Sequence, residues 1–133
     1  MPGLFSRIIS GEIPSYKILE NDLFYSFLDI NPITAGHTLV IPKVEIDYFF
    51  DLGEQELQGI LAFAKPIAAA IKASVPCKRV GIMVAGLEVP HAHLHLVPIS
   101  GTQDLNFKNA SPASQTALDQ TAALIRQNLE SSN

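Results

Sequence analysis

The strongest constraint on the fold of this chain is a short segment in which histidine occupies every second position, at His91, His93 and His95, with alanine and leucine between them. Successive side chains of a β-strand point to opposite faces of a sheet. The segment therefore predicts a strand over residues 91–99 with three imidazoles on one face and small apolar side chains on the other. The apolar face can pack into a core, which leaves the histidine face free to form a site.

Other segments predict further strands and helices around this one. Short apolar or alternating runs between turn residues favour strands, and apolar residues at helical spacing favour helices. Because strands outnumber helices and separate them along the chain, we expect an α+β domain with a mostly antiparallel sheet, in which the strand over 80–85 neighbours the histidine strand. The expected elements are a short helix at 4–9, strands at 15–19, 23–28, 38–41, 80–85 and 91–99, a central helix after residue 51, and a C-terminal helix at about 111–129.

Two helix starts are predicted from capping patterns. Asp51 with Glu54 three residues later resembles a capping box ahead of an apolar helical stripe. That stripe stays in phase across Pro66, so we expect one helix despite the hydrogen bond that proline removes. Ser111 followed by Pro112 predicts an N-cap and first turn for the last helix.

Length and composition exclude several classes of protein. A chain of 133 residues is long enough for one domain, spanning 1–133, and too short for two of ordinary size. The net charge of −4 and the scattered basic residues argue against a long nucleic acid as partner, because no basic stripe is present. Apolar runs are too short to cross a bilayer, and the N-terminus lacks the layout of a signal peptide. With a single cysteine, Cys77, the chain is expected to be cytoplasmic.

Three interpretations of the alternating histidines are open from the residues alone. Packing gives no reason for three imidazoles in a row, which counts against a merely structural strand. A metal site is possible because imidazole suits zinc, copper and iron, although the strand contains no Asp, Glu or Cys to complete the ligand shell. Phosphate chemistry is favoured, because a neutral imidazole is a good nucleophile near pH 7 and its neighbours can donate hydrogen bonds to phosphoryl oxygens. The fourth histidine, His37, is either a buried core residue or a support for the other three.

The residues also resemble a known family. Residues 91–97 match the histidine triad (HIT) signature, His-x-His-x-His followed by two apolar residues. Three further segments occur in that family's usual order and spacing, so the resemblance covers roughly residues 4–99. It is strongest to the Hint-like branch, the nucleoside phosphoramidate hydrolases. The three segments are Ile-Ile-Ser-Gly-Glu-Ile-Pro at 8–14, Phe-Leu-Asp-Ile-Asn-Pro at 27–32, and Gly36 to Lys43.

This resemblance implies a HIT-like fold, with a five-stranded sheet, one central helix and a C-terminal helix, and a catalytic role for each histidine. His93 would attack the α-phosphorus of a nucleotide and form a nucleotidyl-histidine that water then hydrolyses. His95 would hold phosphoryl oxygens, while His91 and His37 would sustain the hydrogen-bond network behind them. The carbonyl of Gly86 would orient His93 by accepting a hydrogen bond from its other ring nitrogen.

The resemblance likewise implies a binding site for a purine mononucleotide and a homodimer that pairs its sheets. Asp29 matches the position that binds the ribose hydroxyls, which suits a carboxylate acceptor. Leu4, Phe5, Phe27 and Ile30 match positions that sandwich the base. Leu4 and Ile30 could equally be core residues, whereas this alternative is less favoured for Phe5 and Phe27. Neither a metal nor another cofactor is required in this scheme.

The chain departs from the family on the side of the leaving group. The Asn and the Ala-Gly-Gln segment that usually precede the triad are absent, with Leu87 in place of Gln and Glu88 where Ser or Thr is frequent. A carboxylate repels a phosphoryl group unless it is protonated or paired with a cation. We therefore expect Glu88 to favour an amine leaving group, as its partner or as its acid. A catalytically weak nucleotide-binding module and, less favoured, a histidine-ligated metal protein remain the alternatives.

Overall fold

The structure is a computed structural model that describes residues 2–131 and contains one five-stranded sheet, ordered β1-β2-β3-β5-β4. Every pair of neighbouring strands is antiparallel, as the sequence predicted. Three short 3₁₀ turns, η1 to η3, join the larger elements. In chain order the elements are α1 (Leu4–Ile9), β1 (Lys17–Glu20), β2 (Phe24–Leu28), β3 (Thr38–Pro42), η1 (Phe49–Asp51), α2 (Glu54–Ser74), β4 (Arg79–Met83), β5 (Leu94–Ile99), η2 (Thr102–Asp104), η3 (Phe107–Asn109) and α3 (Gln115–Ser131).

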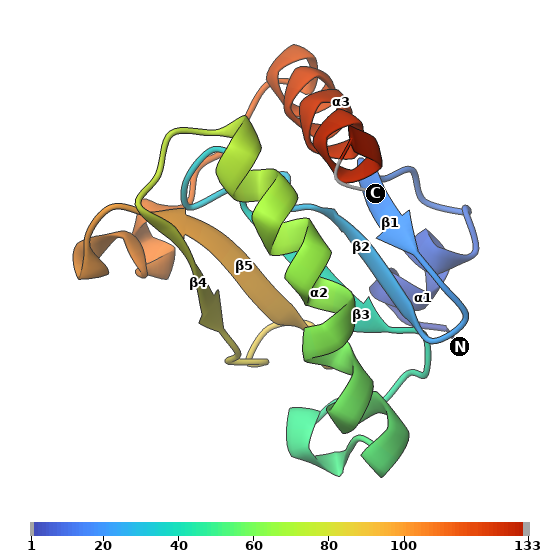
Figure 1. Ribbon diagram of the computed structural model, residues 1–133. Helices are drawn as coiled ribbons and strands as arrows, with labels where there is room; N and C mark the ends of the chain where they lie inside the picture. The colour runs from blue at the N-terminus through green and yellow to red at the C-terminus, as the bar shows by residue number, and fades with distance from the viewer. Residues whose placement is uncertain (1, 132–133) are drawn as a thin grey trace.

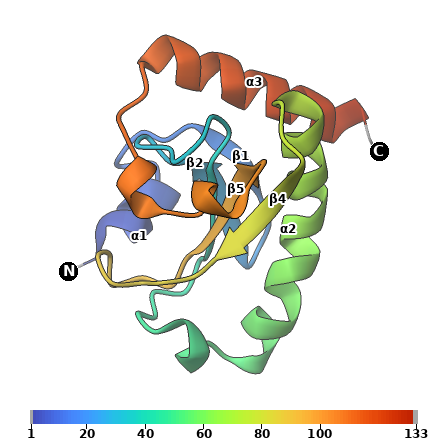
Figure 2. The ribbon, with the colours of Figure 1, turned by 90° about the vertical axis from the view of Figure 1, so that its left-hand side faces the viewer.

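The sheet separates the molecule into two sides. Helix α2 lies across one face, and α1 lies behind the opposite face together with the turns η2 and η3 (Figures 1 and 2). The larger apolar core fills the α2 side, where α3 packs on α2 and β1. Its buried side chains are Ile18, Phe24, Leu28, Val40, Ile60, Phe63, Ala64, Ile67, Ala70, Ile71, Leu94, Leu96, Leu118, Ala122, Ile125 and Leu129.

Alternation along the central strands places different residues on the two faces. Val40 of β3 belongs to the larger core, whereas its neighbours Leu39 and Ile41 pack with α1 in a second apolar cluster. Leu94 and Leu96 of β5 also belong to the larger core, so the intervening His95 faces the α1 side. The alternation predicted from the histidine segment is therefore confirmed within β5.

The histidine strand begins later than predicted. β5 starts at Leu94, so His91 and His93 precede the regular strand rather than lying in it. The ladder to β3 ends with the Val40–Leu94 pair. Beyond that pair, the amide of Ala92 donates instead to the carbonyl of Ile46 at 2.7 Å, and the chain leaves the sheet.

Both predicted helix starts need correction. Helix α2 is capped by the backbone of Gly53, with no side-chain cap, because Asp51 is part of η1. Helix α3 begins at Gln115, and the Ser114 hydroxyl accepts a hydrogen bond from the Ala117 amide at 3.1 Å. α2 runs unbroken through Pro66, as expected.

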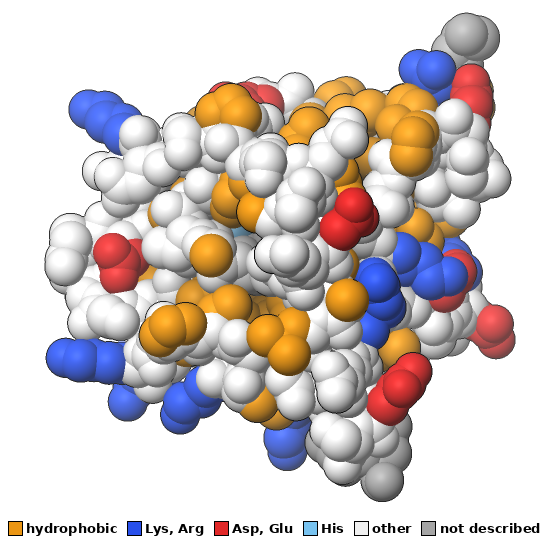
Figure 3. All heavy atoms as spheres, turned by 90° about the horizontal axis from the view of Figure 1, so that it is seen from above, with side chains coloured by type: hydrophobic (Ala, Val, Ile, Leu, Met, Phe, Trp, Pro, Cys, Tyr) orange, Lys and Arg blue, Asp and Glu red, His pale blue; other side chains and the backbone are white. Residues whose placement is uncertain are grey.

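The charged side chains form no basic stripe on the face seen in Figure 3, where Lys and Arg are dispersed around the margin and interspersed with Asp and Glu. Within residues 2–131, no helix combines the length and hydrophobicity needed to cross a membrane.

The turn that leads into β3 depends on a glycine. Gly36 has a φ of +99°, and a Cβ built there would lie 3.2 Å from side-chain carbons of Val75 and Pro98. The same turn is closed by hydrogen bonds of Thr34, whose carbonyl accepts from the His37 amide at 3.0 Å and whose hydroxyl donates to the Pro98 carbonyl at 2.7 Å. Gly36 therefore allows the approach of the loop to β5 that sets the position of His37.

We predict that Gly36→Ala lowers the free energy of unfolding by about 2–4 kcal/mol, since it combines an unfavourable φ with a steric clash. Gly11→Ala is the matched control, because Gly11 also has a positive φ of +84° but has no neighbour within 4 Å of the new Cβ. It should cost only about 1 kcal/mol. Denaturant unfolding measures both values, and equal losses would contradict the steric part of this explanation.

Candidate functional site

A cleft of about 490 Å³ is lined by residues of α1 and η3, the elements that lie on the sheet face opposite α2. Every predicted site residue lines it except His91. The lining also includes residues outside the predicted set, among them Ala85, Leu87 and Val89, and Phe107 of η3. The predicted residues that line it are Leu4, Phe5, Phe27, Asp29, Ile30, His37, Gly86, Glu88, His93 and His95.

One end of the cleft is apolar. Phe5 of α1 and Phe27 of β2 are buried and meet edge to face, with ring centroids 5.6 Å apart. Leu4 and Ile30 are exposed at 46% and 57%, so they are rim residues rather than core. The apolar lining is thus present without a ligand, and two of its side chains remain free to cover one.

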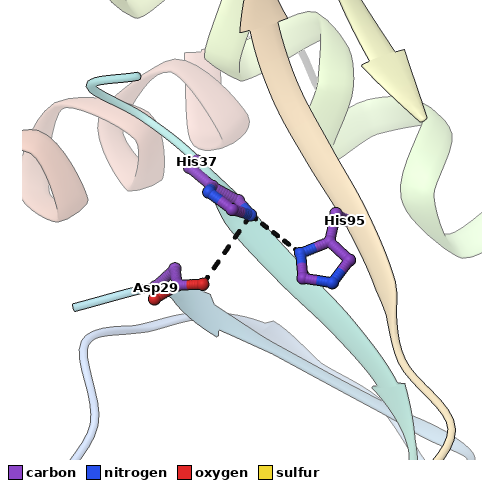
Figure 4. Close-up of side chains that lie close together, drawn as sticks. All are labelled: Asp29, His37 and His95. Carbon is purple, nitrogen blue, oxygen red and sulfur yellow. Dashed lines mark hydrogen bonds and ion pairs between the residues drawn. The ribbon is translucent and has the colours of Figure 1, made fainter. Parts of the chain in front are cut away.

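A chain of hydrogen bonds determines the tautomer of His37. The backbone amide of Ile33 donates to Nδ1 of His37 at 3.0 Å, so the single proton of this neutral ring is on Nε2. His37 Nε2 lies 2.9 Å from Nδ1 of His95 and can only donate to it (Figure 4). The proton of His95 is therefore on Nε2, the nitrogen left without a protein partner.

His93 receives its orientation from the backbone two residues earlier. Its Nδ1 lies 2.7 Å from the carbonyl oxygen of His91, and because a carbonyl can only accept, this nitrogen carries the proton. The lone pair of His93 is therefore on Nε2. The prediction that the Gly86 carbonyl accepts this bond is wrong, because the carbonyl of His91 accepts it, while Gly86 lies in the cleft wall with a φ of +73°.

The Nε2 atoms of His93 and His95 are both accessible from the cleft. Among the described residues, the one buried side-chain nitrogen or oxygen without a partner is Nδ1 of His91. The unpaired Nε2 atoms of His93 and His95 thus keep access to the cleft, and the two rings lie 4.9 Å apart between centroids. The cleft presents one basic nitrogen and one N–H donor side by side.

His91 supports the site from behind. Its Nε2 donates to the carbonyl of Pro42 at 2.8 Å, and its ring meets Phe5 edge to face, with centroids 5.6 Å apart. Phe5 makes the same kind of contact with His93, with centroids 5.3 Å apart. The apolar end of the cleft is thus packed directly against the triad.

The segment after β3 anchors both parts of this arrangement. The Glu45 carboxylate accepts hydrogen bonds from the Gly3 amide at 2.8 Å and the Ser6 hydroxyl at 2.5 Å, which attaches α1. The carbonyls of Pro42 and Ile46 accept from His91 and Ala92. One stretch of five residues, 42–46, therefore attaches both α1 and the start of the histidine segment.

Burial keeps the side chains of His37, His91 and His95 neutral. The pKa of His95 falls to about 3, first because burial penalises the charged form and then because positive charge on His37 and His93 would repel it. Burial also lowers the pKa of His37, partly offset by the Asp29 carboxylate. The pKa of His91 is lowered mainly by burial. At neutral pH, His37, His91 and His95 act as uncharged donors and acceptors.

Asp29 stands at the junction between the apolar end and the histidines. Its Oδ1 accepts from the Asn31 amide at 2.8 Å, and its Oδ2 lies 3.8 Å from His37 Nε2 (Figure 4). With its side chain 23% exposed, the carboxylate retains acceptor capacity toward the cleft.

Asp29, His37 and His95 are also the residues that could hold a metal, since one ligand atom from each lies within 4.8 Å of the others. A metal on Nε2 of neutral His37 would displace its proton to Nδ1, where the Ile33 amide already donates. Two N–H groups would then face each other. The observed hydrogen bonds therefore favour a proton-bearing chain over a ligand set at these three residues.

Phe107 is a cleft residue that sequence reasoning missed. It lies in η3, and its ring meets that of His95 with centroids 5.1 Å apart. The loop 100–114 contains neither a periodic apolar pattern nor a recognisable motif, so no sequence signal pointed to it.

Comparison with known proteins identifies close relatives. The HIT domain family matches residues 10–102. An uncharacterized HIT-like protein of Borreliella burgdorferi is 37% identical over 81% of this chain and 83% of its own length. The adenosine 5'-monophosphoramidase HNT1 of Saccharomyces cerevisiae is 38% identical over 71% of this chain and 61% of its own length.

Solved structures agree with the fold. A hypothetical histidine triad nucleotide-binding protein of Sulfolobus tokodaii superposes with a TM-score of 0.85 and 26% identity, over 96% of this chain and 91% of its own. A zinc-bound histidine triad family protein of Mycobacterium smegmatis superposes with a TM-score of 0.82 and 31% identity, over 96% and 92% of the two chains.

We predict that stability falls as pH is lowered from 6.5 toward 3. The ordinary histidine pKa of 6.5 applies to the unfolded chain, and the folded value for His95 is about 3. Between these two pH values the unfolded state binds a proton that the folded state does not. The contribution of His95 to stability is therefore fully present above pH 6.5 and is lost as the pH falls toward 3. Each such histidine contributes a slope of up to about 1.4 kcal/mol per pH unit. Denaturant unfolding from pH 7.5 to 4 measures the slope, and His95→Gln should make it shallower; an unchanged slope would count against a buried neutral His95.

Proposed function

Because the chain belongs to the HIT family, we propose that it is a nucleotide-binding hydrolase acting at the α-phosphate of a purine nucleoside phosphoramidate or a related nucleotide ester. The observation that carries this proposal is the complementary pair in the cleft: a lone pair on His93 Nε2 beside an N–H on His95 Nε2. A nucleophile adjacent to a neutral donor suits attack on phosphorus with stabilisation of the phosphoryl oxygens.

The proposed reaction has two steps. In the first, His93 Nε2 forms a bond to the α-phosphorus as the bond from phosphorus to the leaving amine or alcohol breaks, and the departing group takes up a proton from water or from Glu88. The positive charge on the nucleotidyl-histidine is stabilised by the Nδ1 hydrogen bond to the His91 carbonyl. In the second step, water attacks phosphorus and gives up a proton to the solvent, the N–P bond breaks, and neutral His93 is regenerated with release of the nucleotide monophosphate.

The remaining residues are assigned to binding. His95 donates from Nε2 to a phosphoryl oxygen, and His37 keeps it in that tautomer. Asp29 accepts from the ribose hydroxyls. The purine lies at the apolar end among Leu4, Phe5, Phe27 and Ile30. This assignment agrees with the name of the similar yeast protein, an adenosine 5'-monophosphoramidase.

We further propose that the protein is a homodimer, as the family resemblance implied. β4 is an edge strand of the sheet. Ile82 of this strand is 54% exposed. An apolar side chain on an edge strand is expected to be exposed in a single subunit if that strand pairs with a second copy.

His93→Ala should reduce turnover of adenosine 5'-phosphoramidate by a factor of at least about 10³, because the nucleophile is removed. Release of AMP and ammonia measures the rate, and calorimetry with AMP checks that the variant still binds. Equal turnover by the two proteins would contradict the assignment. Binding of AMP by the wild type without hydrolysis of any substrate would favour the alternative, a catalytically weak nucleotide-binding module.

Glu88 is assigned to the leaving amine, since its exposed carboxylate lines the cleft and has no ion-pair partner among residues 2–131. Glu88→Gln should slow hydrolysis of substrates with amine leaving groups more than of those with neutral alcohols. A loss on the order of 10² would indicate that Glu88 protonates the amine. A loss of a few-fold is typical of an exposed ion pair with a cationic amine.

The matched control is Glu130→Gln, which removes an exposed carboxylate from α3, outside the cleft. It should leave both rates unchanged. An identical effect of Glu88→Gln on amine and alcohol substrates would remove its role.

A further inference from the structure

We propose that Phe107 determines which leaving group the site accepts, and that it selects leaving groups with an aromatic or flat apolar body. This inference rests on the proposed function, because it assigns the end of the cleft beyond the phosphate. Phe107 lies outside the part of the chain that matches the HIT domain.

The position of Phe107 follows from the arrangement of the elements. α1 and η3 lie on the same face of the sheet but at opposite ends across the strands, with α1 at the right and the orange turns η2 and η3 at the left of Figure 1. His95, on β5 between them, contacts Phe107 through its ring. A nucleotide with its base against α1 and its phosphate at the histidines therefore directs its leaving group toward η3.

Phe107 is held in place by a tightly bonded turn. The Asn106 side chain accepts from the Lys108 amide at 2.9 Å, and the Asn109 side chain donates to the Gln103 carbonyl at 3.0 Å. The Asp104 carboxylate, at the start of the same loop, accepts from the Ser100 amide at 2.8 Å. These bonds fix the backbone on both sides of the ring, so Phe107 is ordered before a ligand arrives.

The downstream end of the loop is attached to the other wall of the cleft. The amides of Ser111 and Ala113 donate to the carbonyls of Pro32 and Ile30, at 3.3 and 3.1 Å. The turn that carries Phe107 is therefore supported from β5 on one side and from the loop before β3 on the other.

Burial shows that the ring does not serve the core. Phe107 is 45% exposed and belongs to neither of the two apolar clusters among the described residues. Holding a phenyl ring partly in water on a rigid turn gains little folding free energy. The ring gains burial when an apolar group occupies the cleft beside it, and an aromatic group adds the preference of rings for offset or edge-to-face contact.

The chemistry expected of the ligand follows. A phosphoramidate or phosphate ester whose amine or alcohol bears an aryl group can place that ring against Phe107. An alkyl leaving group of two carbons cannot make this contact. The site should therefore hydrolyse an aryl-bearing substrate more efficiently than its short alkyl counterpart.

The experiment compares two adenosine 5'-phosphoramidates, one with 2-phenylethylamine and one with ethylamine as leaving group. In the wild type, the ratio of kcat/KM for the aryl over the alkyl substrate should exceed one. Phe107→Ala should lower this ratio about three- to tenfold, the range expected for loss of an aromatic pair. Phe107→Leu keeps an apolar side chain of similar volume and so is less prone to a folding defect. It should lower the ratio less than Phe107→Ala does.

Phe50→Ala is the control, because Phe50 is another exposed phenylalanine in a 3₁₀ turn, 72% accessible, but lies in η1 and outside the cleft. It should leave the ratio unchanged. Dissociation constants of both substrates are also measured in His93→Ala, with and without Phe107→Ala, so that the contact is tested without turnover.

The two proposals fail in different ways. If the wild type hydrolyses neither substrate, the proposed function is wrong, and the ratio of dissociation constants still decides on Phe107. If Phe107→Ala changes neither the kcat/KM ratio nor the ratio of dissociation constants, the role of Phe107 is overturned. A fall in either ratio supports it.

Discussion

The hydrogen bond from the Ile33 amide to Nδ1 of His37 is the interaction on which the chemistry of the cleft depends. A backbone amide can only donate, so this one bond places the proton of His37 on Nε2, and through it the proton of His95 on its own Nε2. The same logic applies at His93, where a backbone carbonyl places the proton on Nδ1. Backbone geometry thereby makes one imidazole a donor toward the cleft and its neighbour an acceptor, although the two side chains are chemically identical.

This polarity is maintained because the effect of burial on His37 outweighs the attraction of the nearby Asp29 carboxylate. Burial lowers the pKa values of His37, His91 and His95, and a protonated ring in the chain would replace acceptors by donors. The larger core on the α2 side and the neutral site on the α1 side are products of the same alternation along β3 and β5. Stability and reactivity are therefore linked through the protonation of the same few groups.

Much of this was accessible from sequence, and the exceptions have physical causes. Alternation predicted which face of β5 carries His95, and motif spacing brought Asp29, His37 and the aromatic residues to one cleft. The carbonyl that orients His93 was assigned wrongly, because hydrogen-bond partners near a strand end depend on where the ladder breaks. Phe107 was missed because the turn that holds it is formed by Asn and Asp side-chain bonds, which leave no periodic pattern.

The stretch after β3 has a consequence for which molecules fit. The Glu45 carboxylate attaches α1, and the carbonyls of Pro42 and Ile46 attach the start of the histidine segment, so both walls are held by the same five residues, 42–46. The distance from the apolar end of the cleft to Nε2 of His93 is thus set by the protein and does not adjust to the ligand. Under the proposed function, a ligand without the nucleoside would not reach the apolar end, and one with an added phosphate between sugar and reacting phosphorus would carry that phosphorus past Nε2 of His93.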